Sequence, residues 1–543
     1  MSSTSVRTAP SSRIHPLAAA GVLAPASAGL ALVALLGGAS PAHATGWSIT
    51  SIADAVAVDG VCSLREAIRA AATDLAVNEC AAGGAVDEIV LAVEGPFAFD
   101  QGQETLTGAA IDLTVRGAPA AGFAEIHLLG ANRFVRVTAG ARLAVRNVGL
   151  VGGSAHAESP AHGGAIRVES ASLALRDVVL TGSSAVNGGA VSIFNSGTGQ
   201  TISIEDTLFL DNLATALDPG VGISCAGGGL DLIAQENTVV GLSNVSFLDN
   251  QADSALPGSI AIGGAMRISL SDSVRFEGRR LLLDGNGVEA TGVVSAAGFS
   301  LSSSVGAAGS VVLEDLRLGG DALFGPAQSH TPRELEVGST GAAPLVLRRV
   351  RSYGFSRVDD AQLVGLLSAS NGSTLIASDL LSVGGPPKGI RLSASGAGST
   401  LVAGNLTVVG HAGVGVELSE STDAELRLEN SILWSNGPGP ANDVQVLLGD
   451  PEFDRVAQHN WIGELGDPDP LFEASGAGDF HLQASSQALD AGDATFDSVG
   501  AYDADHAPRV AGTGLDLGAF ERDALFGDGF ESGDTAAWEA FDF

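Results

Sequence analysis

The sequence predicts an all-β fold: a right-handed, single-stranded parallel β-helix, or solenoid, with an N-terminal capping helix. Three observations predict it. A strand-type motif recurs through most of the chain, glycine-rich turns separate its earlier copies, and one short amphipathic helix precedes them. Copies that start 25 to 38 residues apart are too short to bury their own apolar faces, so they must stack on one another to form a core. Right-handed crossovers are the rule for parallel strands.

The first 44 residues have the pattern of a cleaved secretory signal peptide. Arg7 and Arg13 give it a basic start, residues 21–36 are mostly apolar, and "SPAHA" ends in an Ala-x-Ala site after Ala44. A membrane anchor is the alternative. However, Pro25 interrupts the apolar stretch, which is shorter than the roughly 20 residues that cross a bilayer. The sequence therefore predicts export, with no membrane-spanning segment after signal removal.

The chain is strongly acidic. It has 27 basic and 62 acidic residues, a net charge of −35 (27 − 62), and loss of the two signal arginines makes it −37 (25 − 62). Such a chain is not attracted to nucleic acid or to an anionic membrane surface. We therefore expect no nucleic-acid partner.

Residues 45–85 are predicted to form an N-terminal cap with a short helix. In "CSLREAIRAA" Ser63 is an N-cap and Glu66 follows three residues later, the spacing of a capping box. The predicted helix has one apolar face, formed by Leu64, Ala67, Ile68 and Ala71. Such a helix can cover the open end of a strand stack, which would otherwise pair with other chains.

Cys62, directly before this helix, has two interpretations. The helix dipole could lower the pKa of its thiol, but a nucleophile needs a base, and the next histidine is His127. Cys80 lies 18 residues downstream in a chain predicted to enter an oxidising compartment. We therefore predict a structural disulfide between Cys62 and Cys80, worth about 3 kcal/mol in the chain-entropy model. Cys225 is left over and is expected to be buried; a free reactive thiol is the alternative.

Residues 86–450 are predicted to hold the β-helix repeats. Ten copies of an apolar-x-apolar-x-Asn/Asp pattern begin at residue 143, and the first are "LAVRNVGL" (143–150), "LALRDVVL" (173–180) and "ISIEDTLF" (202–209). Weaker copies start at Val274, Leu345 and Leu375. Alternation with period two is typical of strands. Leucine-rich repeats, the competing solenoid, would need a helical half-repeat and a fixed leucine frame, and neither is present.

The fifth residue of each copy is predicted to form a corner of the coil. It is Asn or Asp in eight of ten copies and differs only at Gly278 and Arg349. Asn and Asp tolerate the left-handed backbone that a sharp bend needs, and stacked side chains can hydrogen-bond along the column. Glycine pairs at 163–165, 188–190, 227–229 and 263–265 are predicted to form other corners. The predicted corner ladder is Asn147, Asp177, Asp206, Asn244, Asp315, Asp379, Asn405 and Asn430.

Residues 451–522 are predicted to form the C-terminal end of the β-helix, and residues 523–543 a tail. "GDPDPLF" (466–472) is a proline-punctuated turn, and "FHLQASSQALDAG" is a final strand followed by a glycine turn. Asp467, Asp469, Asp490 and Asp493 are expected to cap turns through the local backbone. Calcium binding is the alternative for these carboxylates, and no other cofactor is expected.

Both ends resemble a known group of exported bacterial proteins. "CSLREAI" (62–68), with a cysteine shortly downstream, resembles the signature of the CSLREA domain. "DPLFEASGAGDFHLQASSQALDAGDA" (469–494) and "APRVAGTGLDLGAFE" (507–521) resemble the choice-of-anchor Q region, and "LFGDGFESGDTAAW" (525–538) resembles a tail of exported Gram-negative proteins. The resemblance implies a pectin-lyase-like β-helix, secreted or on the outer cell surface of a Gram-negative bacterium, and it implies no particular reaction.

The motifs of β-helix enzymes that act on pectin-type polysaccharides are missing. The hydrolases divide acid and base roles among clustered aspartates near Gly-His-Gly and Arg-x-Lys. Here "VDDA" (358–361) and "GHAG" (410–413) fall in different copies, and no Arg-x-Lys exists. Asp359 and Asp360 are expected in an exposed loop. The lyases need carboxylate-held calcium and an Arg or Lys base, and the sequence has no dense aspartate cluster across adjacent copies.

Two functional hypotheses follow. The first is a non-catalytic, adhesin-like protein that binds an extracellular polysaccharide, matrix or cell-surface ligand as a monomer; exposed serines such as those of "SLSSSV" (300–305) are consistent with it. The second is a polysaccharide lyase or glycoside hydrolase that acts on acidic polysaccharide, with at least three carboxylates converging on one groove. Its walls would be the long loops at 212–239 and 249–273. The sequence favours the first and assigns no catalytic, cofactor-binding or metal-binding residue.

Overall fold

The computed structural model describes residues 44–522, except 119–121, 131, 218–223, 321, 325–332, 354–362, 385–387, 422, 439–441, 449–458, 497 and 511–512. The predicted signal peptide up to residue 43, the tail 523–543 and the pair Asp359 and Asp360 therefore lie outside the described residues. Residues His43–Phe543 form one unit by their internal contacts, and the following description concerns the described part of that unit.

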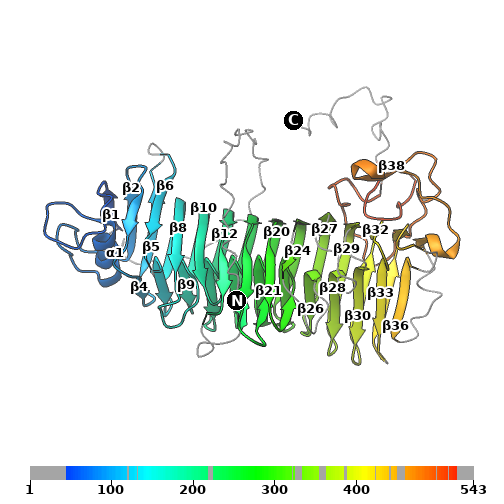
Figure 1. The fold of residues 1–543 in the computed structure, drawn as a ribbon, viewed down its shortest axis with the longest axis horizontal. Coiled ribbons are helices and arrows are strands. Elements are labelled where there is room, and N and C mark those ends of the chain that lie inside the picture. Colours follow the sequence, from blue (N-terminus) through cyan, green and yellow to red (C-terminus); the bar gives the residue numbers. More distant parts are fainter. Residues whose placement is uncertain are drawn as a thin grey trace, which may run out of the picture. The chain divides into compact units, whose positions relative to one another are not determined.

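The strands stack in parallel, coil over coil, so the predicted right-handed parallel β-helix is confirmed (Figure 1). The described strands form two long sheets, of 22 and 12 strands, a three-stranded sheet and a two-stranded sheet. We call the 22-stranded sheet the first sheet and the 12-stranded sheet the second sheet. The three-stranded sheet, called the flange, consists of β14 (Ser224–Ala226), β18 (Ile260–Ile262) and β22 (Val293–Ser295).

The first sheet begins before the sequence repeats and includes strands on both sides of a corner. Its members up to the last long bent strand are β1 (Ala44–Ile49), β2 (Val86–Leu91), β3 (Phe97–Phe99), β5 (Asp112–Gly117), β6 (Ala124–Leu128), β8 (Arg142–Ser154), β10 (Ser172–Ala185), β12 (Thr201–Leu210), β13 (Leu213–Thr215), β16 (Val239–Leu248), β17 (Gln251–Ser254), β20 (Arg275–Asp284), β21 (Gly287–Ala290), β24 (Ser310–Gly319), β25 (Ala322–Phe324), β27 (Leu345–Tyr353) and β29 (Thr374–Val383). It ends with β31 (Thr400–Gly404), β32 (Thr407–Val409), β34 (Glu425–Glu429), β35 (Ile432–Trp434) and β37 (Trp461–Ile462).

The second sheet has one strand per coil. It consists of β4 (Glu104–Thr107), β7 (Val135–Thr138), β9 (Ile166–Glu169), β11 (Val191–Asn195), β15 (Leu230–Ala234), β19 (Met266–Asp272), β23 (Phe299–Val305), β26 (Arg333–Ser339), β28 (Leu363–Ser370), β30 (Lys388–Ser395), β33 (Val416–Glu420) and β36 (Val444–Leu448). The antiparallel pair is β38 (Phe472–Ala474) and β39 (Asp479–Leu482). Two 3-10 turns, Gly463–Leu465 and Ser475–Ala477, accompany it.

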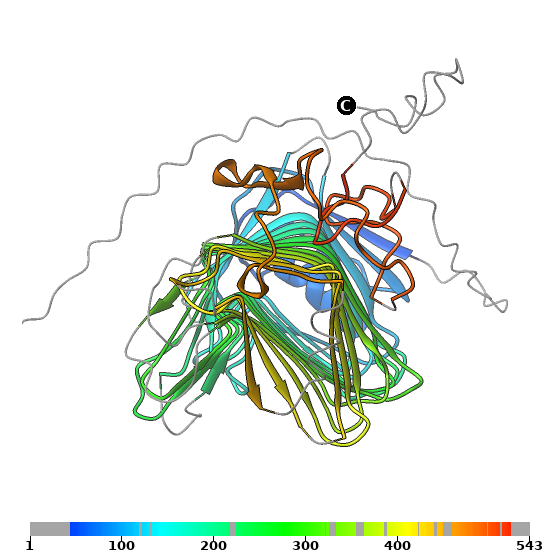
Figure 2. The same cartoon turned by 90° about the vertical axis from the view of Figure 1, so that its right-hand side faces the viewer.

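Each long strand of the first sheet bends at a left-handed Asn, Asp or Arg, so one strand serves two sides of the coil; the two longest, β8 and β10, bend again at Gly152 and Gly182. In β16 this residue is Asn244, with φ +55°. Together with the second sheet, the two halves of the first sheet enclose a three-sided core (Figure 2). Equivalent side chains stack on one another inside it, as Phe209 and Phe247 do with ring centroids 4.6 Å apart.

A second corner is held by buried asparagines that the sequence analysis missed. Asn212, Asn250 and Asn286 occupy successive coils and are at most 1% exposed. The Asn250 Oδ1 accepts hydrogen bonds from the backbone N–H and the side-chain amide of Asn212, at 3.2 and 2.9 Å. The Asn250 side chain in turn donates to Asn286 Oδ1 and to the Phe209 carbonyl, both at 3.0 Å. These bonds satisfy the polar groups where the strands end.

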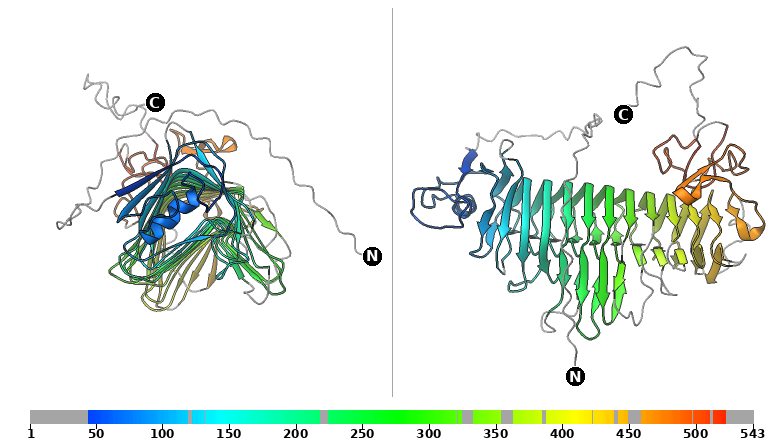
Figure 3. Two further views of the ribbon diagram at one scale, coloured as in Figure 1. Left: turned by 90° about the vertical axis from the view of Figure 1, so that its left-hand side faces the viewer. Right: turned by 45° about the horizontal axis from the view of Figure 1, so that its top comes forward.

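The predicted capping helix is α1 (Leu64–Thr73), which lies over the first coil (Figure 3). Ser63 Oγ accepts the Glu66 N–H at 3.3 Å and Glu66 Oε2 accepts the Ser63 N–H at 3.0 Å, which confirms the capping box. The four predicted apolar positions are buried. Arg65 is fully buried as well, because it bonds Asp54 and Glu104 at 2.6 Å each and stacks over Phe99.

The cysteines are placed as the sequence analysis expected. Cys62 and Cys80 form a disulfide that ties the start of α1 to the segment after it. Cys225 is reduced and buried in a small apolar cluster between the flange and the strands after the second corner. Burial raises the pKa of the Cys225 thiol to about 12, so this thiol is unreactive at neutral pH.

One repeat has a different register from the predicted one. The copy predicted to start at Val274 would put Gly278 at the corner, but Gly278 pairs with Leu242 and lies among core side chains. An added Cβ there would come within 2.7 Å of Leu313 Cδ1, so the space is already filled. The corner is Arg280, with φ +52°, and the copy starts at Phe276. The prediction was wrong because arginine gives no local signal for left-handed backbone.

Candidate functional site

The eight predicted corner residues form one continuous column. All have φ between +48° and +60°, and the strand register aligns them from coil to coil, with Arg280 and Arg349 filling the two gaps. The column has two parts. In the first four coils the side chains are solvent-accessible, and Asn244 donates to Asp206 at 2.7 Å. In the later coils the column is covered by residues 459–522, which we call the C-terminal block.

The C-terminal block lies along the side of the last coils rather than beyond them (Figure 1). Arg509 reaches Asp379 Oδ1 at 2.7 Å, and both side chains are almost fully buried. His506 Nε2 is 3.0 Å from Asp315, and Asn430 exchanges two 2.9 Å hydrogen bonds with the backbone of Asp493. The later corner residues therefore form the surface on which the C-terminal block docks. The spacing of residues in the sequence could not predict this docking.

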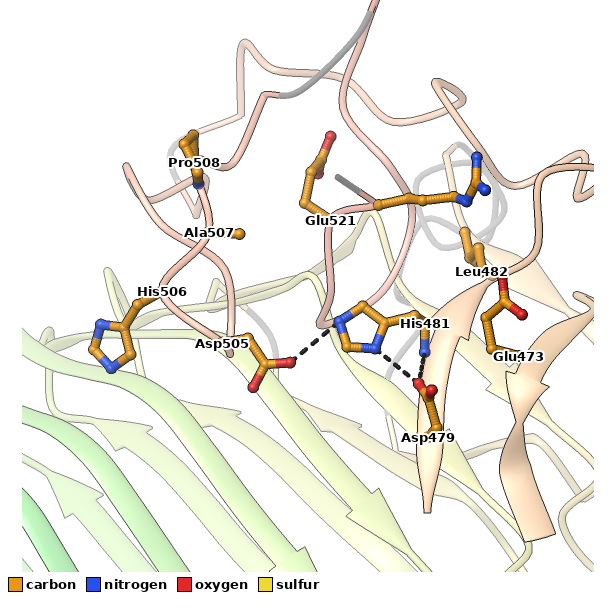
Figure 4. Close-up of a pocket in the computed structure, with 10 residues that line it drawn as sticks. Glu473, Asp479, His481, Leu482, Asp505, His506, Ala507, Pro508 and Glu521 are labelled. Atoms are coloured by element: carbon orange, nitrogen blue, oxygen red, sulfur yellow. Dashed lines mark hydrogen bonds and ion pairs between the residues drawn. The ribbon is translucent and has the colours of Figure 1, made fainter. Parts of the chain in front are cut away.

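The block contains a cavity of about 480 Å³. Figure 4 draws its lining residues, among them Glu473, Asp479, His481, Asp505 and Glu521. His481 lies between two carboxylates, with Nδ1 2.8 Å from Asp479 and Nε2 3.1 Å from Asp505. The hydrogen bond to Asp505 is the main reason that the pKa of His481 rises to about 9. The pKa of Asp505 falls to about 2.

These shifts fix the protonation states of the cavity wall. Near neutral pH His481 is an imidazolium and Asp505 a carboxylate, and Arg351 also bonds Asp505. A general acid or base needs a pKa near the working pH, which neither group has. The three side chains form a structural ion cluster that links the block to β27.

The residues considered for metal or acid chemistry are used structurally. Within the described residues no group of three or more His, Cys, Asp or Glu side chains is placed to hold a metal ion. Asp467, Asp469 and Asp493 accept backbone N–H groups of nearby residues at 2.8 Å, as predicted for turn caps. Asp490 instead accepts the N–H of the distant Thr513 at 3.2 Å, so it links two segments of the block rather than capping a local turn. His411 of "GHAG" is buried against Ser382.

A different candidate site lies on the outward face of the second sheet. Inward residues such as Val168, Ile193 and Leu232 enter the core, so their neighbours point outward. The register aligns these neighbours in two rows over five coils. We call them the strip, defined as Arg136, Arg167, Glu169, Ser192, Phe194, Asp231, Ile233 and Arg267.

Tight glycine turns connect the flange to the strands of the second sheet, while the flange itself packs against β13, β17 and β21 of the first sheet. Gly188 has φ +60°, and a Cβ there would lie 2.1 Å from the Val191 carbonyl oxygen. Gly227 makes the same turn in the next coil. Flange residues Ile260 and Ile262 alternate with Ala261, which is buried in the small cluster, so they lie on the opposite side. The loops at 212–239 and 249–273 contain the flange strands β14 and β18, and their role as the walls of a groove stays a prediction.

The polar groups of the strip are held by ion pairs. Arg136 and Arg167 bind Glu169 at 2.6 and 2.9 Å, and Arg167 also donates to Ser192 Oγ at 2.7 Å. Arg267 binds Asp231 at 2.8 Å, although burial still raises the pKa of Asp231. The side chains are thus fixed before any ligand arrives, which lowers the entropic cost of binding.

Phe194 is the exposed aromatic residue of the strip. Its side chain is 39% exposed and lies in register between Glu169 and Ile233. His162 pairs with Asn187, which in turn pairs with Ala226 of the flange, and its Nδ1 is 3.0 Å from the Asn187 amide nitrogen. Burial, reinforced by Arg167, Arg133 and Arg267, lowers its pKa to about 4. The sequence could not indicate this set, because its residues come together only through the register between coils.

Comparisons with known proteins identify no family. No protein-family model matches the chain, and no curated protein matches it. Among solved structures, the chain is similar to a double mutant of the periplasmic alginate epimerase AlgG, at 13% identity and a TM-score of 0.29, covering 67% of this chain and 74% of that chain. None of the described helices has the length and apolar character of a bilayer-crossing helix.

Proposed function

We propose that the protein is an exported, non-catalytic β-helix that binds a glycan along the strip. The observation that carries this proposal is Phe194, an exposed aromatic ring flanked by fixed polar groups on a flat row of strands. An aromatic face can pack on the apolar face of a sugar while neighbouring groups bind its hydroxyls. Exposed serines such as Ser302 and Ser304 extend the polar surface to the next coils.

Export and an adhesin-like role at the outer surface of a Gram-negative bacterium are part of this proposal. The Cys62–Cys80 disulfide supports an oxidising destination. The helix formed by residues of "CSLREAI" caps the stack, which is consistent with membership of the CSLREA, choice-of-anchor Q group. The wall of fixed ion pairs in Figure 4 supports a binding protein rather than an enzyme at that cavity.

A glycan array probed with the full chain tests the proposal. Phe194→Ala should weaken binding of the glycans retained by the wild type about tenfold, equivalent to about 1.4 kcal/mol. Phe123→Ala is the matched control, because Phe123 is 40% exposed and lies away from the strip, before β6. The proposal would be contradicted if the wild type bound no glycan on the array, or if Phe194→Ala and Phe123→Ala lost the same amount of affinity.

A lyase acting on acidic polysaccharide is the second candidate, and one observation favours it. The charge of Arg167 is one of the causes that lower the pKa of His162 to about 4, so His162 is a neutral imidazole at neutral pH. A uronate carboxylate bound by Arg167 would offset that charge and raise the pKa of His162 towards the range that a proton acceptor needs. Incubation with uronate polymers would then produce unsaturated ends that absorb in the ultraviolet, and His162→Ala would abolish them. If the absorbance does not change, the lyase hypothesis is rejected and glycan binding remains the proposed function.

A further inference from the structure

We infer that the glycan bound by the strip is anionic, a chain of uronic acid units whose carboxylates pair with the strip arginines. This inference rests on the proposed function and names the substrate class of the same site. It runs against the net charge of the chain, which by itself would repel a polyanion. The local charges of the strip are therefore the deciding observation.

The charge balance reverses around the strip. Four arginines, Arg133, Arg136, Arg167 and Arg267, interact there with three carboxylates, Glu158, Glu169 and Asp231. The local balance is +1 (4 − 3). The rest of the chain holds 23 basic and 59 acidic residues, a balance of −36. Arginines are thus concentrated where the aromatic ring and the fixed polar groups already lie, in a chain that is otherwise strongly acidic.

The same arginines also act on His162. After burial, the next three causes that lower its pKa are Arg167, Arg133 and Arg267. Arg133 itself is buried and donates to the carbonyls of Gly163 and His162, both at 2.7 Å, so its charge is fixed in place. Its pKa of about 10 leaves it protonated at neutral pH. A buried fixed cation favours an anion at the surface above it.

The spacing of the arginines suits a polymer lying along the stack. Arg136 and Arg167 are in adjacent coils, ~4.8 Å apart, and Arg267 is three coils beyond Arg167, ~14 Å away. A guanidinium presents a planar fork that matches a carboxylate. Between them Phe194 is exposed and suits a ring face, while the buried Ser192 holds Arg167 in place through a 2.7 Å hydrogen bond. A repeating acidic sugar chain offers these groups in a regular series.

The test compares three probes with the full chain by calorimetry: uronic acid oligosaccharides, their carboxyl-reduced neutral counterparts of equal length, and the neutral glycans found on the array. The wild type should bind the uronic acid chains about tenfold more tightly than the reduced chains, the loss expected for one charge-assisted pair. Raising the salt concentration should weaken binding of the uronic acid chains and leave binding of the reduced chains unchanged.

A matched pair of variants locates the effect. Arg136→Gln should lose about tenfold in affinity for the uronic acid chains. Arg116→Gln is the control, because Arg116 is 32% exposed and pairs with Glu88 at 2.7 Å, as Arg136 is 31% exposed and pairs with Glu169 at 2.6 Å. Both pairs are half-exposed, so neither change is expected to unfold the chain.

The outcomes separate the two proposals. Equal binding of uronic acid and reduced chains, or equal losses in the two variants, would overturn the anionic ligand and leave glycan binding intact. Binding of none of the three probes would overturn glycan binding itself. The inference would be established if the wild type preferred the uronic acid chains and if this preference were lost in Arg136→Gln but kept in Arg116→Gln.

Discussion

Glu334, at the residue scale, is a carboxyl group enclosed in the stack. It is fully buried, it accepts a 2.5 Å hydrogen bond from Ser352, and its other oxygen has no partner among the described residues. Burial raises the pKa of Glu334 to about 7. The folded state therefore holds the proton more tightly than the unfolded chain does. Stability from this group is fully present below the unfolded pKa of about 4.5 and is lost as pH rises towards 7.

Glu334→Gln should remove this pH dependence. The neutral amide avoids the buried charge, so the variant should be more stable than the wild type above pH 7 by roughly 1–3 kcal/mol and gain little at acidic pH. Denaturant unfolding at a series of pH values measures the free energy of unfolding of the variant and of the wild type. Glu277→Gln changes an exposed carboxylate and should leave the pH profile unchanged. A profile that Glu334→Gln does not alter would contradict the assigned burial cost.

Asn250 shows why the second corner depends on amides. Its side chain bonds Asn212, Asn286 and the Phe209 carbonyl inside the stack. Asn250→Ala should destabilise the protein by roughly 3 kcal/mol, because each buried group left unpaired costs about 1–3 kcal/mol. The control is Asn244→Gly at the exposed corner, where glycine keeps the left-handed backbone. Chemical denaturation should separate the variants; equal losses would contradict a special role for the buried ladder.

At the element scale, the lid depends on Arg65. Asp54 and Glu104 are both within 2.6 Å of its guanidinium, which is 0% exposed. Arg65→Met should destabilise the lid by roughly 3–5 kcal/mol, because two carboxylates lose a buried partner. Hydrogen exchange of α1 is the measurement. Arg69→Ala, at a side chain 40% exposed, should cost less than about 1 kcal/mol. Slow exchange of α1 in the Arg65 variant would refute the expectation.

The C-terminal block should loosen at high pH. The pKa of His481 is raised from 6.5 to about 9 by Asp505 and Asp479, so the contribution of this cluster to docking is fully present below 6.5 and is lost as pH rises through 9. Protease cleavage within the block should accelerate above pH 9. His481→Gln should show the same acceleration already at neutral pH, and His459→Gln, altered at an exposed histidine, should not. Cleavage independent of pH would argue against the cluster.

The elements differ in how far the sequence could predict them. Corners such as Asn147 and Asp177 were predictable because left-handed backbone has a local signal in Asn and Asp. Arg280 has no such signal, and Asn212 looked like an ordinary turn residue next to Asp211. The docking of Arg509 on Asp379 joins residues 130 positions apart, which no local pattern encodes. The strip depends on register between coils, which only the folded stack supplies.

At the scale of the whole molecule, a solenoid gains stability from each neighbouring coil and is vulnerable at its ends. β1 covers the edge of β2 through a six-residue parallel register, and α1 covers the coil end beside it. The Cys62–Cys80 disulfide holds the lid in place. Without residues 44–85, the edge of β2 and the ring of Phe99 lose their cover. Unpaired strand edges recruit strands from other chains.

A chain lacking residues 44–85 should therefore associate end to end. Light scattering during gel filtration should show oligomers that grow with protein concentration, whereas the intact chain should stay monomeric. The double variant Cys62→Ser/Cys80→Ser is the control, because it removes the staple, worth about 3 kcal/mol, but keeps the strand and helix that cover the edge. It should unfold at a lower temperature and remain monomeric. A truncated chain that stays monomeric at every concentration would mean that the first coil is protected by something other than its lid.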